Sequence, residues 1–241
     1  MTDFSFASSD LKLDGTFFNP PNKKDKCPAI LFIHGWTSER VRSFQYAKAL
    51  ADLGYICMLF DMRGHGTSEG DINTITTKEF LEDVLSAYDY FTQVEGIDKE
   101  NISVVGSSFG GYLATLLTTK RNVKRLSLRV PADYPNEAFN KSKMQTSGSD
   151  KAIIEWRKQP KKPNETFALE ALADFNGDVQ IIESGKDDQV PHQVMVNFAN
   201  AIKDKTKLTH IIMRNAPHSM KASPFKDEVK QILVKWFGDR L

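Results

Sequence analysis

The stretch Gly106-Ser107-Ser108-Phe109-Gly110 decides the fold of this chain. It lies between the apolar run Ile102–Val105, typical of a buried strand, and the helical run Tyr112–Thr119. A strand that turns directly into a helix forces the serine at the turn into a strained conformation, so nearby residues must lack side chains. Only Ser108 has glycine two residues away on both sides. We therefore expect Ser108 to stand at the edge of a sheet, near a helix N-terminus that favours negative charge.

A serine hydroxyl in such a turn is a candidate nucleophile, and it needs a general base that is itself oriented by an acid. Five histidines compete for the role of base. His218, in Asn215-Ala216-Pro217-His218-Ser219, follows the last expected strand and precedes the final helix, as the order Ser, Asp, His requires. Structural or surface roles are expected for the other four, which are His34, His65, His192 and His210.

Outward from this turn, short apolar runs alternate with longer runs of helical period, which is typical of an α/β protein with a mostly parallel sheet. The expected strands are Phe4–Ala7, Leu11–Phe18, Ala29–Ile33, Tyr55–Phe60, Ile102–Val105, Arg125–Val130, Val179–Glu183 and Leu208–Met213. The first two predict an antiparallel hairpin at one sheet edge. A capping-box pattern at Thr76 and Glu79 predicts one helix, and Ser223-Pro224 predicts the start of the last one.

One segment, residues 131–174, interrupts this alternation. It is too long for a simple connection, because structureless loops beyond about 12–15 residues are uncommon unless they are functional. We predict a small, partly helical cap inserted after the sixth strand of a single domain that spans residues 1–241. Its aromatic residues either face a pocket or pack the cap onto the domain, and packing is favoured for each of Tyr134, Phe139, Trp156 and Phe167.

Composition argues against several classes of partner. Lys and Arg total 32 and Asp and Glu total 31, so no basic excess indicates a nucleic acid or an anionic membrane. No run approaches the ~18 apolar residues that cross a bilayer, and the N-terminus lacks a signal pattern. The absence of metal-ligand and phosphate-loop spacings predicts no metal and no cofactor. Cys27 and Cys57 do not form a disulfide framework, and we expect a cytoplasmic protein.

Four signatures, in chain order, resemble the α/β-hydrolase superfamily of serine hydrolases from about Leu11 to the C-terminus. They are Ile33-His34-Gly35-Trp36, Phe60-Asp61-Met62-Arg63-Gly64-His65-Gly66-Thr67-Ser68, Gly106-Ser107-Ser108-Phe109-Gly110-Gly111, and Asp187-Asp188-Gln189-Val190-Pro191 with the His218 loop. The resemblance implies an α/β-hydrolase fold, with a mostly parallel eight-stranded sheet flanked by helices. It also implies two-step acyl transfer to water.

Carried onto this sequence, the resemblance implies Ser108 as nucleophile and His218 as general base. The backbone N–H groups of Trp36 and Phe109 then form the oxyanion hole.

The resemblance leaves two candidates for the acid. Asp187 stands four residues before Pro191, a frequent spacing in the superfamily. Asp188 stands three residues after Gly185, which is another frequent spacing. We favour Asp187, and only one of the two adjacent side chains can point at His218.

The expected substrate is a small ester of a short-to-medium acyl or aromatic acid, because the position and length of the cap resemble small-cap bacterial esterases, including cinnamoyl and feruloyl esterases. A thioesterase, an acyltransferase or a peptidase would use the same triad. A dienelactone hydrolase normally has cysteine where this chain has Ser108. A binding protein on a hydrolase scaffold would need a broken triad, and none of the three roles is vacant in this sequence.

Overall fold

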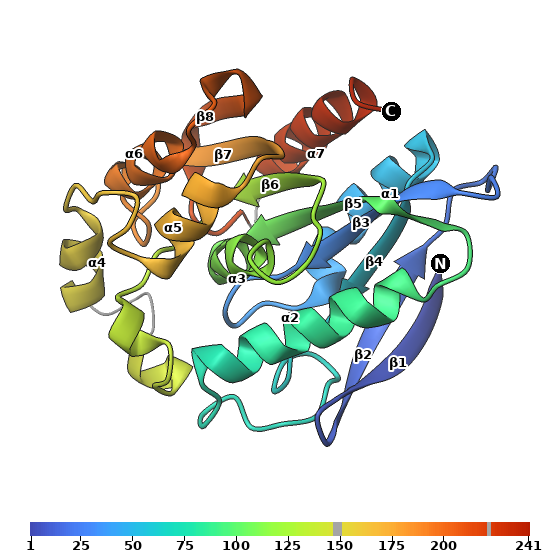
Figure 1. Ribbon diagram of the computed structural model, residues 1–241, viewed down its shortest axis with the longest axis horizontal. Helices are drawn as coiled ribbons and strands as arrows, with labels where there is room; N and C mark the ends of the chain where they lie inside the picture. The colour runs from blue at the N-terminus through green and yellow to red at the C-terminus, as the bar shows by residue number, and fades with distance from the viewer. Residues whose placement is uncertain (147–150, 221–222) are drawn as a thin grey trace.

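The computed structural model describes residues 1–146, 151–220 and 223–241, with Ser223 described by its backbone alone. A central sheet has helices on both faces (Figure 1). Its strands are β1 (Thr2–Ser8), β2 (Leu11–Phe18), β3 (Cys27–Ile33), β4 (Ile56–Phe60), β5 (Ile97–Ser107), β6 (Arg125–Arg129), β7 (Asp178–Lys186) and β8 (Leu208–Pro217).

The strand order across the eight-stranded sheet is β1-β2-β4-β3-β5-β6-β7-β8. The pairs β1–β2 and β2–β4 are antiparallel, and the other pairs are parallel. The expected mostly parallel sheet with an edge hairpin is thereby confirmed. The carboxyl ends of β3, β5, β6, β7 and β8 meet at one edge, which is where ligands bind in parallel α/β sheets.

Helices connect the strands and form one layer on each face. They are α1 (Phe44–Leu53), α2 (Thr77–Thr92), α3 (Phe109–Leu117), α4 (Lys151–Arg157), α5 (Phe167–Asp174), α6 (His192–Ala201) and α7 (Ser223–Gly238). Short 3-10 turns are η1 (Arg40–Ser43), η2 (Asn136–Ala138), η3 (Lys143–Thr146) and η4 (Lys205–Lys207). Helices α1 and α7 pack together on one face, while α2, α3, α5 and α6 follow one another on the other (Figure 1).

The start of α2 shows how local sequence determines an element. The hydroxyl of Thr76 accepts a hydrogen bond from the amide of Glu79, and the carboxylate of Glu79 accepts one from the amide of Thr76, at 3.2 and 2.8 Å. This is the expected capping box, which satisfies two amides that the first turn leaves without partners. The apolar stripe of α2 then buries Phe80, Val84 and Phe91 against the sheet.

The sheet separates two apolar cores because successive strand residues point to opposite faces. Along β4, Met58 and Phe60 join the core under α2 and α3, whereas Cys57 and Leu59 join the core under α1 and α7. Strands covered on both faces read as continuous apolar runs, which explains their sequence. Both cysteines are free and buried; Cys27, preceded by polar residues in the chain, already lies inside β3.

The expected cap region between β6 and β7 contains η2, η3, α4 and α5. Residues 147–150 of this region lie outside the described residues. Its N-terminal half is joined to the start of α2, since Lys143 donates its amide to the carbonyl of Ile75 at 2.8 Å. Its last helix, α5, packs against α3 and α6 and buries Leu169 and Leu172.

Candidate active site

Ser108 occupies a sharp turn between β5 and α3. Its backbone has φ 53° and ψ −116°, a left-handed conformation that costs a non-glycine residue of order 1–3 kcal/mol. The flanking glycines permit this turn. A Cβ at Gly106 would lie 2.5 Å from the carbonyl oxygen of Gly110, and one at Gly110 would lie 2.3 Å from that of Ile33. Strand, turn and helix therefore leave room only for hydrogen at these two positions.

His218 follows β8 and connects the serine to a carboxylate. Its Nε2 lies 3.1 Å from Oγ of Ser108, and its Nδ1 lies 2.7 Å from Oδ2 of Asp187. In this arrangement the Nδ1 proton is donated to the carboxylate, so Nε2 is free to accept the proton of the serine hydroxyl. The structure thus brings together the three side chains expected from the sequence.

Asp187, and not Asp188, lies against His218. Its second carboxylate oxygen accepts the amides of Gln189 and Val190 at 2.9 and 2.7 Å, which fixes the side chain in the loop after β7. The Asp187 side chain is 4% exposed, whereas Asp188 is exposed to solvent. A carboxylate with three hydrogen bonds is well suited to orienting an imidazole.

The two amides expected to form an oxyanion hole flank the serine. Phe109 is the first residue of α3, and neither its amide nor that of Trp36 donates a hydrogen bond to any described residue. The loop of Trp36 approaches closely, because a Cβ at Gly35 would lie 3.5 Å from Cβ of Ser108. Free amides beside a nucleophile can stabilise negative charge on a tetrahedral intermediate.

Two buried histidines, His34 and His65, anchor the loop that carries Trp36. His34 accepts the amide of Met62 on Nε2 at 3.0 Å, and His65 accepts the amide of Thr37 on Nε2 at 3.2 Å. Burial lowers the pKa of His34 to about 3 and also lowers the pKa of His65. Both rings are therefore neutral acceptors, which is the structural role expected for these two histidines. Thr37 has φ 55°, so this contact holds a strained residue.

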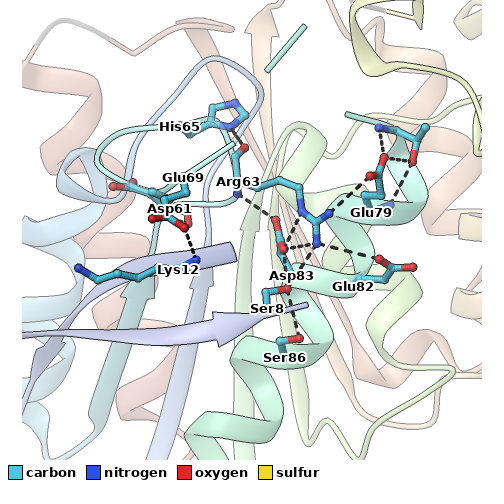
Figure 2. A network of polar contacts seen from close by, with 12 residues as sticks. Ser8, Lys12, Asp61, Arg63, His65, Glu69, Glu79, Glu82, Asp83 and Ser86 are labelled. Atoms are coloured by element: carbon cyan, nitrogen blue, oxygen red, sulfur yellow. Dashed lines mark hydrogen bonds and ion pairs between the residues drawn. The ribbon is translucent and has the colours of Figure 1, made fainter. Parts of the chain in front are cut away.

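A buried ion pair holds Arg63, the residue whose carbonyl His65 contacts. His65 donates Nδ1–H to the carbonyl of Arg63 at 3.0 Å, and Figure 2 shows the Arg63 guanidinium reaching from there to α2. Its Nη2 lies 2.7 Å from Oδ1 of Asp83, which also accepts the hydroxyl of Ser8 at 2.7 Å. Glu79 and Glu82 lie further out at 3.6 and 4.0 Å. Residues 63–66 therefore have a structural role: they hold the loop beside Ser108 in place.

The candidate site opens into a cavity of about 620 Å³. Its apolar wall comes from the sheet and from α7, through Phe32, Val105, Ile182, Val229 and Leu233. Of the four aromatic residues expected in the cap, Tyr134 lines the cavity. Phe139 and Phe167 instead contact each other edge to face, with ring centres 5.7 Å apart, and Lys161 lies over the ring of Trp156 at 3.7 Å.

Sequence reasoning missed the four cationic residues in the wall of this cavity, which are Arg42, Arg129, Arg157 and Lys226. Arg129 is the last residue of β6, where it pairs with Ser107 of β5, and Arg157 is the last residue of α4. A charged residue at the carboxyl end of a buried parallel strand is a usable signal, because that edge carries the ligand site in such sheets. No comparable signal distinguishes Arg157 from the other basic residues of the cap.

The remaining two histidines lie outside the cavity. Glu183 of β7 accepts from His192 at 2.6 Å and from His210 at 2.8 Å, and these contacts lower the pKa of Glu183 against the effect of burial, which raises it. Across the described ranges 1–146, 151–220 and 223–241, no group of three His, Cys, Asp or Glu residues is arranged to hold a metal ion. Within the same ranges, no helix combines the length and apolarity of a membrane span.

Curated proteins and solved structures are similar to this chain. Quorum-quenching protein AidA of Acinetobacter baumannii is 32% identical over 142 residues, which cover 58% of this chain and 46% of that protein. The mitochondrial palmitoyl-protein thioesterase ABHD10 of Pongo abelii is 26% identical over 218 residues, which cover 82% and 69%. This chain therefore matches less than half the length of the first relative and about two thirds of the second.

A solved structure, Est1E from Butyrivibrio proteoclasticus with ferulic acid bound, shares the fold with a TM-score of 0.75 at 18% identity, covering 97% of each chain. The family described as Serine aminopeptidase, S33 matches residues 24–153, which contain the first three signatures quoted above. This chain belongs to that family, within the α/β-hydrolase superfamily of serine hydrolases.

Proposed function

We propose that this protein hydrolyses carboxylic esters of short-to-medium acyl or aromatic acids through an acyl-enzyme on Ser108. The observation that carries the proposal is the unbroken chain of contacts from Ser108 Oγ to His218 to Asp187 at the wall of a cavity. A serine hydroxyl becomes an effective nucleophile when a base accepts its proton and a carboxylate orients that base.

In the first step Oγ of Ser108 attacks the ester carbonyl while Nε2 of His218 takes the hydroxyl proton. The amides of Trp36 and Phe109 donate hydrogen bonds to the oxyanion that forms. Collapse of this intermediate breaks the ester bond, and His218 gives its proton to the leaving alcohol. Water then attacks the acyl-enzyme with His218 again as base, which releases the acid and restores Ser108.

The substrate class rests on the size and the wall of the cavity. A volume of about 620 Å³ lies within the ~300–1,000 Å³ that is typical of small-molecule sites. Its wall combines aliphatic side chains with the aromatic residues Phe32, Trp36, Tyr46 and Tyr134, the last of which comes from the cap. Est1E binds ferulic acid, which is an aromatic acid of this size class. Such a cavity favours a short chain or a single ring over a long lipid.

The test is a series of 4-nitrophenyl esters of increasing acyl length, together with hydroxycinnamoyl esters. Each buried methylene contributes about 0.8 kcal/mol until the cavity is full, so kcat/KM is expected to rise and then fall. An optimum beyond about twelve carbons, or strong activity on emulsified triglyceride, contradicts the proposal. Ser108→Ala is expected to abolish turnover in a folded protein, and a fluorophosphonate probe is expected to label Ser108 alone.

Thioester hydrolysis is the second candidate, because the ABHD10 relative, which aligns with 82% of this chain, is a palmitoyl-protein thioesterase. Paired oxygen and thiol esters of one acyl group separate the two activities. A preference for the thiol ester well beyond its greater intrinsic reactivity would favour the thioesterase. Aminoacyl 4-nitroanilides belong in the same assay, and activity confined to them would mean a peptidase and overturn the proposal.

A further inference from the structure

The cavity beside Ser108 carries positive charge without any carboxylate in its wall. Four cationic side chains line it, and they are Arg42, Arg129, Arg157 and Lys226. Among the described residues that line the cavity there is no Asp and no Glu. The whole chain has almost equal numbers of acidic and basic residues, so this segregation of charge is local. Cavity walls of one sign concentrate ligands of the opposite sign.

Arg129 contacts the residues that carry the candidate catalytic groups. Its Nε donates to Oγ of Ser107 at 2.9 Å, and its Nη1 donates to the carbonyl of His218 at 3.0 Å. Both acceptors are neutral, and no carboxylate lies within ion-pair distance of Arg129 in the described parts of the chain. Burial lowers the pKa of Arg129, although a guanidinium remains protonated in proteins. The carboxylate of Asp187 acts on Arg129 only from beyond ion-pair distance and is hydrogen-bonded to His218, so an anionic ligand would be a direct charged partner for this guanidinium.

Arg157 approaches the cavity from the cap, and among the described residues no carboxylate lies within ion-pair distance of it, although the buried carboxyl of Asp133 interacts with it electrostatically. It is 1% exposed, and it donates to the carbonyls of Asp133 and Gln189 at 3.0 and 3.1 Å. Its Nη2 is buried and has no hydrogen-bond partner among the described residues, and its Cζ lies 4.7 Å from the ring centre of Tyr134, which also lines the cavity. The carboxylate of Asp133 is used elsewhere, because it accepts the amide of Tyr134 and the hydroxyl of Thr166. A buried donor that the protein leaves unpaired points to a ligand that supplies the acceptor.

Arg42 of η1 and Lys226 of α7 complete the set at the solvent side. Neither forms an ion pair with any described residue. Neighbouring lysines outside the cavity do: Lys48 pairs with Asp52 at 2.9 Å, and Lys230 pairs with Asp227 at 2.8 Å. Ion pairs therefore form on α1, which follows η1, and on α7, but Arg42 and Lys226 have none with a described residue.

From these contacts we infer that the substrate of this enzyme carries a second, anionic group, a carboxylate or a phosphate, which the cavity arginines bind while Ser108 attacks the ester. A guanidinium offers paired N–H donors that match the two oxygens of such a group. The inference rests on the proposed ester hydrolysis and specifies its substrate. Arg157 and Arg129 bind the anion in the desolvated part of the cavity, and Arg42 and Lys226 attract it from solution.

Matched pairs of esters test the inference. Mono(4-nitrophenyl) adipate and 4-nitrophenyl hexanoate share the acyl length and differ in a terminal carboxylate. 4-Carboxyphenyl butanoate and 4-carbamoylphenyl butanoate place the same difference on the alcohol. In one pair, kcat/KM is expected to be about tenfold or more higher for the anion, because hydrogen bonds to charged groups are worth more than neutral ones. The pair that shows the preference identifies which side of the ester carries the anion.

Charge-removing variants identify the residues responsible. Arg42→Gln and Lys226→Gln are each expected to lower the anionic-to-neutral ratio of kcat/KM several-fold, and added salt is expected to lower it in the wild type. Lys48→Gln and Lys230→Gln are the matched controls, because they remove a lysine from α1 and α7 outside the cavity. Both controls are expected to leave the ratio unchanged. Ratios near one in both pairs, or equal losses in the controls, overturn the inference.

A binding measurement separates this inference from the proposed function. Calorimetry with Ser108→Ala and each intact ester measures affinity without turnover, and the anionic ester is expected to bind more tightly. If neutral esters are hydrolysed but neither pair shows a preference, the inference fails and the proposed function stands. If no ester is hydrolysed while the variant still prefers the anionic ligand, the proposed function fails and the anion site stands.

Discussion

The amide of Thr37 donates a hydrogen bond to Nε2 of His65 at 3.2 Å, across 28 residues of chain. The imidazole can accept it only when its proton lies on Nδ1, and that proton is donated to the carbonyl of Arg63. Thr37 follows Trp36, whose amide we assign to the oxyanion hole. The tautomer of His65 therefore helps to determine where that amide points, which makes His65 a positioning residue.

His65→Phe is expected to lower kcat about tenfold or more while changing KM little. Phenylalanine keeps a ring near Trp36 and Phe80, whose centres lie 5.3 and 5.6 Å from His65, but it removes the acceptor for Thr37. Loss of one oxyanion donor costs about 10²–10³ in turnover, and displacement of the loop is expected to cost part of that. Steady-state kinetics on one short-chain ester provides the measurement.

Two further variants distinguish positioning from general destabilisation. His65→Gln retains an oxygen acceptor and is expected to recover part of kcat. His210→Phe removes a histidine that contacts Glu183 outside the cavity, and it is expected to leave kcat unchanged. A His65→Phe protein with normal kcat and only a lower Tm would show that the contact is merely structural.

Asp187→Asn is expected to lower kcat by up to about 10⁴, because an amide favours the wrong tautomer of His218. Asp188→Asn provides a matched control one residue away, since the Asp188 side chain is exposed to solvent. The second variant is expected to retain nearly normal turnover. Single-turnover kinetics on both proteins checks the assignment, and a crippled Asp188→Asn beside a normal Asp187→Asn would reverse it.

Asp83→Ala is expected to reduce the free energy of unfolding by about 3–5 kcal/mol, because it leaves the buried guanidinium of Arg63 uncompensated. Asp89→Ala is the control on the same helix, since its ion pair with Arg121 is partly exposed and its loss costs ~0–1 kcal/mol. Urea denaturation of both variants measures the difference. Equal losses would show that the Arg63–Asp83 pair contributes no more than a surface ion pair.

Asp133→Asn is expected to stabilise the protein at pH 7.5 by roughly 1–3 kcal/mol. Burial raises the pKa of Asp133 to about 6, from 3.8 in the unfolded chain. Between pH 3.8 and 6 the folded state holds the proton more often, so this group lowers stability as pH rises through that window. The amide removes the effect while its oxygen still accepts the amide of Tyr134.

Denaturant unfolding of the wild type and of Asp133→Asn at pH 5 and pH 7.5 measures this difference. The stabilisation by the variant is expected to be larger at pH 7.5. Asp204→Asn is a suitable comparison, because Asp204 is fully exposed and its pKa is lowered by hydrogen bonds from Thr206. Identical pH dependence in the wild type and in Asp133→Asn would contradict a raised pKa at Asp133.

The sequence alone determined the turn at Ser108 and the order of the elements around it. Only glycine fits at Gly106 and Gly110 once a strand turns directly into a helix, and that constraint acts between residues close in the chain. The strands were equally predictable, because burial on both faces of a parallel sheet leaves a continuous apolar run. His218 followed from chain order, since one histidine lies between the last strand and the last helix.

The tertiary structure alone decided the contacts that depend on side-chain direction across distant elements. Asp187 and Asp188 are chemically identical neighbours, and only the fold of the loop after β7 aims one of them at His218. In the sequence His65 is only one residue of a glycine-rich turn, and its hydrogen bond with the Thr37 amide is seen only in the structure. Arg129 and Arg157 lie in one cavity wall because β6 and the cap meet at the carboxyl edge of the sheet. Local periodicity carries no information about such contacts, because they depend on how elements distant in the chain pack together.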